Sequence, residues 1–243
     1  MKKVLVLLTL VLTLTFTAQA QFINWGVRGG VGLAGYVDDM ASSSPIMGAN
    51  VGVYLSYAFT NSQSMLAESF CLQTGLNMVR RGTNFKEVFE KELNMSIREG
   101  YYSGWYAQIP ILATVRYELP IRSPGHRALF SVGPAFSFGV IGTRNDYKIS
   151  PGMPQRTWNY KINEDAFNEL NRMDFGFIIA GGYEYKDLTF MLHFDYGMLA
   201  VSEGTDVLKT NENAIYGSKN EAVVPNGNNL AVLLTIGYQF PIR

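Results

Sequence analysis

Apolar residues recur at every second position through eight segments of this 243-residue chain. A strand points successive side chains to opposite faces, so a period of two predicts strands with two different faces. In the segment from 105 to 117, every odd position carries an apolar or aromatic residue, whereas the even positions include Gln108 and Arg116. The chain is therefore predicted to be all-β, with one apolar and one mixed face on each strand.

The eight predicted strands lie at 25–37, 50–59, 69–81, 105–118, 128–142, 173–185, 188–200 and 230–240. Only Lys186 and Asp187 separate the sixth strand from the seventh, and a two-residue hairpin fixes which residues face each other. The pairs predicted on the apolar face are Tyr185 with Leu188, Tyr183 with Phe190, Gly181 with Leu192, Ile179 with Phe194 and Phe177 with Tyr196. The pairs predicted on the mixed face are Glu184 with Thr189, Gly182 with Met191, Ala180 with His193 and Ile178 with Asp195.

The chemistry of the two faces decides between two kinds of eight-stranded barrel. A soluble lipocalin-like barrel buries its apolar side chains inside, whereas a membrane barrel turns its apolar face to lipid. Charged residues on the mixed face favour the antiparallel transmembrane β-barrel, because unpaired charges are costly to bury in an apolar calyx. We expect the inward charged side chains to neutralise one another as a polar network in the lumen: Arg28, Arg116, Glu118, Glu184, His193 and Asp195.

The predicted connections are unequal in length, as in outer-membrane barrels with short periplasmic turns and longer extracellular loops. The short turns are expected at 60–66, 120–127 and 186–187, and the outer connections at 38–45, 82–101, 143–172 and 201–228. Aromatic residues near the strand ends predict a girdle at each membrane interface. The periplasmic girdle comprises Tyr57, Phe59, Tyr117, Tyr183, Tyr185, Tyr238 and Phe240, and the outer girdle Trp105, Phe175, Phe177 and Tyr196.

Residues 1–20 have the pattern of a cleavable signal peptide. Lys2 and Lys3 precede an apolar run, and Ala18-Gln19-Ala20 provides a small-residue cleavage site. The apolar run is shorter than the roughly 20 residues of a transmembrane helix. We therefore expect residues 21–243 to form one β-barrel domain in the cell outer membrane. Cys71 is the single cysteine, so no internal disulfide is expected.

The charge and the closing residues indicate the expected partners. The 20 basic and 20 acidic residues balance, which gives no sign of a nucleic-acid partner. Gly237, Phe240 and Ile242 loosely fit the terminal signal that outer-membrane assembly machinery recognises. The expected partners are outer-membrane lipid, the barrel assembly machinery during insertion, and a protein partner bound through the extracellular loops.

Six short segments carry recognisable motifs: 72–82, 108–112, 132–136, 175–177, 180–183 and the closing 236–240. Together they resemble the PorT-like outer-membrane β-barrel family of Bacteroidetes. The resemblance covers most of the chain after residue 20, and it implies fold and location rather than activity because these motifs are structural. The family's namesake takes part in protein secretion across the outer membrane and in gliding. This chain lacks the arginine-and-glycine-rich strand motif of that component, so an accessory role in secretion is a second hypothesis.

Two patterns resemble catalytic or cofactor chemistry. Residues 30–35 spell the glycine pattern of dinucleotide sites, but no helix is predicted after them, so we interpret these glycines as packing residues. His193 and Asp195 share the inward face as an acid-base pair would, which makes a lipid-modifying barrel enzyme the third hypothesis. No nucleophile is identified beside them, so the chain is not expected to be an enzyme. No cofactor and no metal are expected either.

The outer loops are predicted to contain two helical turns. Phe85, Val88, Phe89 and Leu93 form an apolar stripe at helical spacing, and a second turn is expected to begin near Asn163. Eight strands enclose a space that side chains nearly fill, which argues against a general pore. The first hypothesis is therefore an outer-membrane barrel with a structural, surface-interaction or binding role.

Overall fold

A computed structural model describes residues 23–38, 43–58, 70–91, 94–121, 125–149, 158–160, 166–168, 170–201 and 227–241. The predicted signal peptide at 1–20, the turn at 60–66 and residues 202–226 of the last outer connection lie outside these ranges. No helix among the described residues is both long and apolar enough to cross a membrane.

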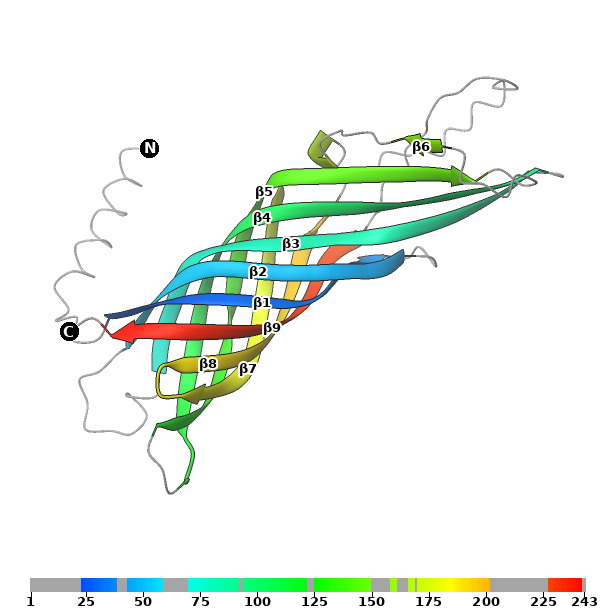
Figure 1. Ribbon diagram of the computed structural model, residues 1–243. Helices are drawn as coiled ribbons and strands as arrows, with labels where there is room; N and C mark the ends of the chain where they lie inside the picture. The colour runs from blue at the N-terminus through cyan, green and yellow to red at the C-terminus, as the bar shows by residue number, and fades with distance from the viewer. Residues whose placement is uncertain are drawn as a thin grey trace, which may run out of the picture.

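Eight long antiparallel strands close into a barrel (Figure 1). They are β1 (Ile23–Asp38), β2 (Ser43–Ala58), β3 (Phe70–Lys91), β4 (Asn94–Glu118), β5 (His126–Ile149), β7 (Met173–Tyr185), β8 (Leu188–Ala200) and β9 (Gly227–Pro241). The last strand pairs with the first, and β4 pairs with β5, so every long strand has two neighbours. The predicted eight-stranded antiparallel barrel is therefore confirmed. A short ninth strand, β6 (Trp158–Tyr160), pairs with β5 near its end.

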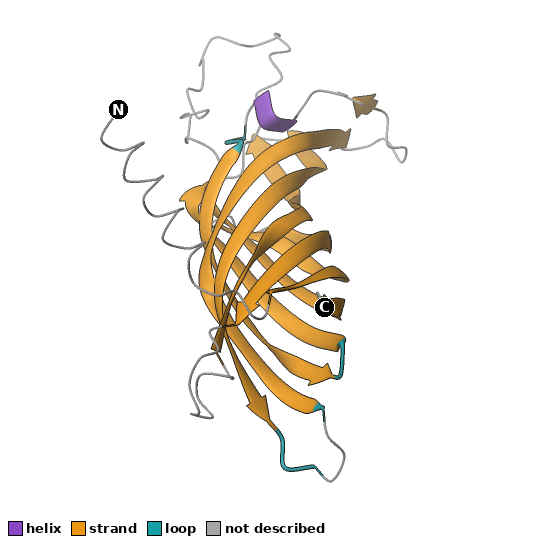
Figure 2. Ribbon diagram, turned by 90° about the vertical axis from the view of Figure 1, so that its left-hand side faces the viewer, coloured by secondary structure: helices purple, strands orange, loops and turns teal. Residues whose placement is uncertain are grey.

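The barrel has two different ends. The turn end contains the β7–β8 connection, the start of β1 and the end of β9, and the loop end contains the opposite strand ends, where β3, β4 and β5 extend beyond β2 (Figure 1). The strands tilt around the barrel, as closure of an eight-stranded sheet requires (Figure 2).

The predicted register of β7 and β8 is confirmed at every pair. Lys186 and Asp187 form the turn between them, and Lys186 adopts a φ of 55°, in the left-handed region that glycine and asparagine favour. The strand bounds at Tyr185 and Leu188 also agree with the sequence prediction. Register follows from the sequence here because a two-residue turn leaves no freedom to slip.

Apolar side chains point outward and mixed ones inward, as predicted. On β1, Val31 and Leu33 are 57% and 60% exposed, whereas Ala34, the residue after Leu33, is buried. On β8, the burial alternates at each step from Leu188 to Met198. The outer surface of the barrel is thus apolar, which is the arrangement of a barrel whose outside faces lipid.

The prediction of an outer loop with a helical turn at 82–101 is wrong. β3 continues to Lys91 and β4 begins at Asn94, so this segment is a strand hairpin. The register sets Lys86 opposite Glu99 and Glu87 opposite Arg98.

The other outer connections are partly described. β5 continues to Ile149, well into the segment 143–172 that was predicted to be a loop. The second predicted helical turn is observed as a single 3-10 turn at Ala166–Asn168, while its expected start near Asn163 lies outside the described residues. The first outer connection is short, because β1 ends at Asp38 and β2 begins at Ser43.

Aromatic rings gather on the outer surface at the turn end. Trp25 stacks on Phe240 with ring centroids 4.4 Å apart, and Phe240 contacts Tyr238 at 4.7 Å. His126 lies 4.6 Å from Tyr185 and also contacts Tyr183. The predicted girdle residue Tyr117 is 65% exposed, and Phe59 lies outside the described residues. Trp25 and His126 extend this aromatic band beyond the residues that the sequence indicated.

Candidate functional site

The lumen is the candidate site, because the described inward side chains place charged and polar groups inside a closed barrel. Apolar layers separate these polar groups: one contains Leu112, Leu129, Ala135, Ile178, Ala180 and Met191, and another Ala34, Val79, Ala231 and Leu233. The ion pairs among the described inward residues form two clusters, one toward each end. Each cluster is held by strands that are far apart in the sequence.

Arg81 is the centre of the cluster toward the loop end. Its Nη1 donates to Asp174 Oδ2 at 2.9 Å, and its Nη2 donates to Asp195 Oδ2 at 2.6 Å. Asp195 also accepts from Gln108 at 2.8 Å, and Asp174 accepts from Asn229 at 3.0 Å. Arg81 is 1% exposed, so its charge is taken fully out of water and depends on these two carboxylates.

Small and aromatic neighbours make room for this Arg81 cluster. Gly197 lies where an added Cβ would overlap the carboxylate of Asp174, so only glycine leaves space for that side chain. The guanidinium of Arg81 lies over the ring of Tyr106 at 5.3 Å from its centroid, a cation-π contact. The hydrogen-bonded side chains of the cluster come from β3, β4, β7, β8 and β9, so the cluster joins these five strands across the lumen.

A second cluster lies toward the turn end around Glu184. Arg127 Nη1 donates to Glu184 Oε1 at 2.8 Å, and Arg116 Nε lies 3.6 Å from Glu184 Oε2. Arg116 also donates to Gln239 at 2.9 Å. Two of the predicted network residues, Arg116 and Glu184, are thus brought together, with Arg127 as a partner that the prediction omitted.

The prediction that Glu118 belongs to the polar network of the lumen is wrong. Its side chain is 79% exposed and lies 3.6 Å from Arg127, outside the closed lumen. The physical reason is position: Glu118 is the last residue of β4, where the strand leaves the barrel at the turn end and its side chain reaches water. The alternation that predicted an inward side chain no longer applies at a strand end.

Arg28 and His193 are buried without an ion pair to the predicted acidic partners. Arg28 is 6% exposed and lies over the ring of Tyr54 at 4.9 Å, while its Nε and Nη2 have no hydrogen-bond partner among the described residues. His193 is 4% exposed, and its Nε2 has none either. The carboxylate of Asp195 is held by Arg81 and Gln108, so His193 and Asp195 are not assembled as an acid-base pair.

The 3-10 turn packs against the barrel strands at the loop end. Ala166, Phe167 and Leu170 are buried in one apolar cluster with Tyr36, Tyr102, Tyr106 and Val201. The ring of Phe167 meets Tyr106 edge-to-face at 5.3 Å. A Cβ added to Gly139 or Gly142 would collide with Phe167. These two glycines of β5 therefore leave the space that the Phe167 ring occupies. Phe167 therefore packs at the loop end on Tyr106, whose ring also lies under the guanidinium of Arg81.

The sequence interpretation missed Arg81 and Asp174, although both continue an alternation that it used. Arg81 follows Val79 at the inward period of β3, and Asp174 precedes Gly176 and Ile178 at the inward period of β7. Both residues lie within the predicted strands 69–81 and 173–185, but the inward set was not extended to them. Applying the period of two to every residue of these two strands is the signal that finds both.

The described residues show no group of three His, Cys, Asp or Glu side chains placed to hold a metal ion. Gly30, Gly32 and Gly35 lie within β1, and a Cβ at Gly30 or Gly32 would overlap the backbone of β9. They are strand glycines where two backbones approach closely, in agreement with the packing interpretation.

Comparison with known proteins gives a family and two similar structures. Residues 17–201 match the family described as outer membrane protein beta-barrel domain. The crystal structure of Neisserial surface protein A is 10% identical, with 89% of this chain and 97% of that chain covered and a TM-score of 0.33. Ail, the attachment invasion locus protein of Yersinia pestis, in complex with the heparin analogue sucrose octasulfate, is 9% identical, with 90% and 99% covered and a TM-score of 0.30. No curated protein matches.

Proposed function

The chain belongs to the family of outer membrane protein beta-barrel domains, and from this premise we propose that it is a non-conducting outer-membrane barrel that binds at its loop end. One observation carries the proposal: the described side chains that point into the lumen are buried, and Phe167 packs at the loop end on Tyr106, beside the Arg81 cluster. A filled lumen leaves the ends and the outer surface as the places where another molecule can be bound.

The loop end is the better candidate for contact with a partner. β3 and β4 pair as a hairpin to Lys91 and Asn94, beyond the last residues that β2 pairs with. The outer edge of β3 past Phe85 is therefore paired on one side only among the described strands. An extended strand with one free edge can accept a further strand from a partner, a recurrent mode of recognition.

The finer parts of the proposal come from the sequence. Residues 1–20 act as a cleaved signal peptide, residues 21–243 form the barrel domain, and insertion uses the barrel assembly machinery. The resemblance to PorT-like barrels of Bacteroidetes supports this subgroup and source. The absence of an assembled pair between His193 and Asp195 supports a role other than catalysis.

Current recordings across planar lipid bilayers test whether the inserted barrel conducts ions. The purified barrel is expected to give no resolvable current steps, because eight strands enclose side chains rather than a water-filled channel. A sixteen-stranded porin in the same bilayer is the control that shows that steps are detectable. Stable, large steps from the wild-type protein would contradict a non-conducting barrel.

Cysteine labelling on intact cells tests which end faces outward. Cys71 is 1% exposed, so the native thiol stays unlabelled by a membrane-impermeant maleimide. We expect Ala200→Cys, at the loop end of β8, to react on intact cells. Asp187→Cys, in the exposed turn at the other end, should react only after the outer membrane is permeabilised. The opposite labelling pattern would reverse the orientation and remove the loop end as the binding surface.

A further inference from the structure

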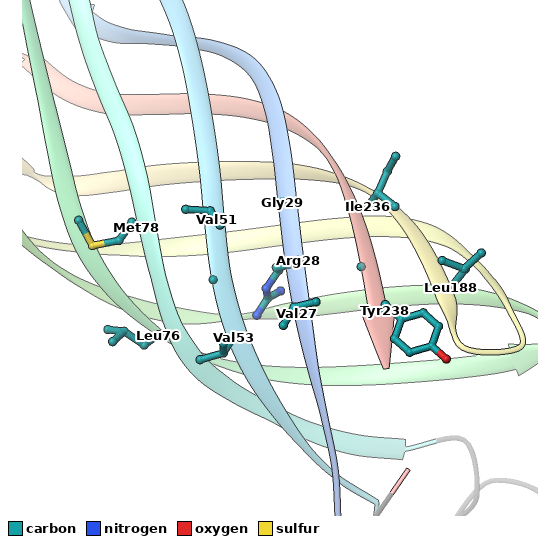
Figure 3. Close-up of a pocket in the computed structure, with 12 residues that line it drawn as sticks. Val27, Arg28, Gly29, Val51, Val53, Leu76, Met78, Leu188, Ile236 and Tyr238 are labelled. Atoms are coloured by element: carbon teal, nitrogen blue, oxygen red, sulfur yellow. The ribbon is translucent and has the colours of Figure 1, made fainter. Parts of the chain in front are cut away.

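Arg28 is a buried cation without an acidic partner among the described residues. Its side chain extends from β1 toward β2 (Figure 3), where the guanidinium lies over the ring of Tyr54 at 4.9 Å from the centroid. The residue is 6% exposed, and its Nε and Nη2 have no hydrogen-bond partner in the described part of the chain. Arginine stays protonated in proteins, so burial does not remove this charge. An ion taken out of water without a partner is costly, and the face of one ring compensates only part of that cost.

The positions next to Arg28 on the inner wall provide no carboxylate. Its partners across the neighbouring strands are Gly52 on β2 and Gly237 on β9. The next inward positions along β1, Gly26 and Gly30, are glycines as well. All four adjacent positions therefore lack a side chain that could neutralise the guanidinium.

The buried carboxylate of the turn-end cluster is already shared by two other cations. Glu184 Oε1 accepts from Arg127 at 2.8 Å, and Glu184 Oε2 lies 3.6 Å from Arg116 Nε. Electrostatic interactions connect Tyr54 with Arg28, Arg116 and Glu184, so these groups share one region of the lumen. With Glu184 divided between two arginines, Arg28 is left as excess positive charge among the described residues of this region.

We propose that Arg28 binds a chloride ion inside the barrel. Chloride accepts hydrogen bonds from Nε and Nη2, and it supplies the negative charge that a water molecule or a neutral side chain lacks. The space is narrow, because Tyr54, Asn77 and Thr189 occupy the places where the adjacent glycines would carry a Cβ. A monatomic anion fits such a space better than a phosphate or a carboxylate. The site requires only the closed barrel and is independent of binding at the loop end.

Urea unfolding in two salts tests the site, and Arg80 offers a matched control. The wild type, Arg28→Met and Arg80→Met are refolded in phosphatidylcholine vesicles, in sodium chloride or in sodium gluconate of the same ionic strength. Chloride at roughly ten times its dissociation constant should raise the ratio of folded to unfolded wild-type protein about tenfold over gluconate, which is too large for the site. We expect the same increase for Arg80→Met, because Arg80 is half-buried and bonds to Ser103 instead. Arg28→Met is expected to unfold equally in both salts.

Bromide locates the ion directly and keeps the test decisive if Arg28→Met does not fold. Crystals of the wild type refolded in sodium bromide are expected to show an anomalous-scattering peak beside the Arg28 guanidinium. The absence of that peak, or equal unfolding of the wild type in both salts, would overturn the chloride site and leave water as the partner of Arg28. A chloride effect that persists in Arg28→Met would also overturn it, because the ion would then act elsewhere. A mobility difference between boiled and unboiled samples shows separately that each protein forms the barrel.

Discussion

Replacing Arg81 by methionine is expected to lower the free energy of unfolding by about 3–5 kcal/mol, the largest effect of any substitution in the lumen. The guanidinium is 1% exposed and donates to Asp174 and Asp195, which are 6% and 3% exposed. Methionine is an unbranched apolar side chain without charge, so two carboxylates would remain buried without their cation. Urea unfolding of the refolded protein in phospholipid vesicles measures the loss.

Two further variants separate the loss of charge from the loss of packing. Arg80→Met changes the neighbouring half-buried arginine, which donates a hydrogen bond from Nε to Ser103 Oγ at 3.0 Å, and should cost about 1 kcal/mol. Adding Asp174→Asn and Asp195→Asn to Arg81→Met removes the stranded charges and should recover most of the lost stability, since replacement of a whole buried ion-pair group is often nearly neutral. If Arg81→Met costs no more than Arg80→Met, the Arg81 cluster is not what joins the strands across the lumen.

The strands were predictable where local pattern and turn length act together. The bounds of β7 and β8 and their register follow from the period of two and from a connection of only two residues, Lys186 and Asp187. The hairpin of β3 and β4 was not predictable from the same information. Alternating charge at 86–91 suits both the four-residue spacing of a helix and facing positions in a hairpin, and the paired strand at 94–99 resolves the choice.

The lumen was predictable as a set of inward residues but not as a set of contacts. Period two identifies Arg28, Arg116, Glu184, His193 and Asp195 as inward, and all five are buried. Which cation meets which carboxylate depends on the tilt and stagger of the closed barrel, which no single strand encodes. Asp195 accordingly meets an arginine of β3 that lies 114 residues away, rather than the histidine two positions before it.

The second large effect is expected on the outer surface. Val31 lies near the middle of β1, points outward and is 57% exposed, between Ala49 of β2 and Leu234 of β9. An arginine at the bilayer midplane of a barrel costs about 2–4 kcal/mol, whereas near the interface it costs roughly 0–1 kcal/mol. We therefore expect Val31→Arg to destabilise the protein by about 2–4 kcal/mol. Ile23→Arg, at the turn end of the same outward face, should cost about 1 kcal/mol or less.

The comparison of these two variants by urea unfolding in phospholipid vesicles is the most direct test of the lipid-facing barrel. The account predicts a penalty that depends on depth, large at Val31 and small at Ile23. Surface substitutions in water usually change stability by about 0.5 kcal/mol or less. If Val31→Arg and Ile23→Arg both stay within that limit, the outer face of the barrel is wetted and the membrane account is contradicted.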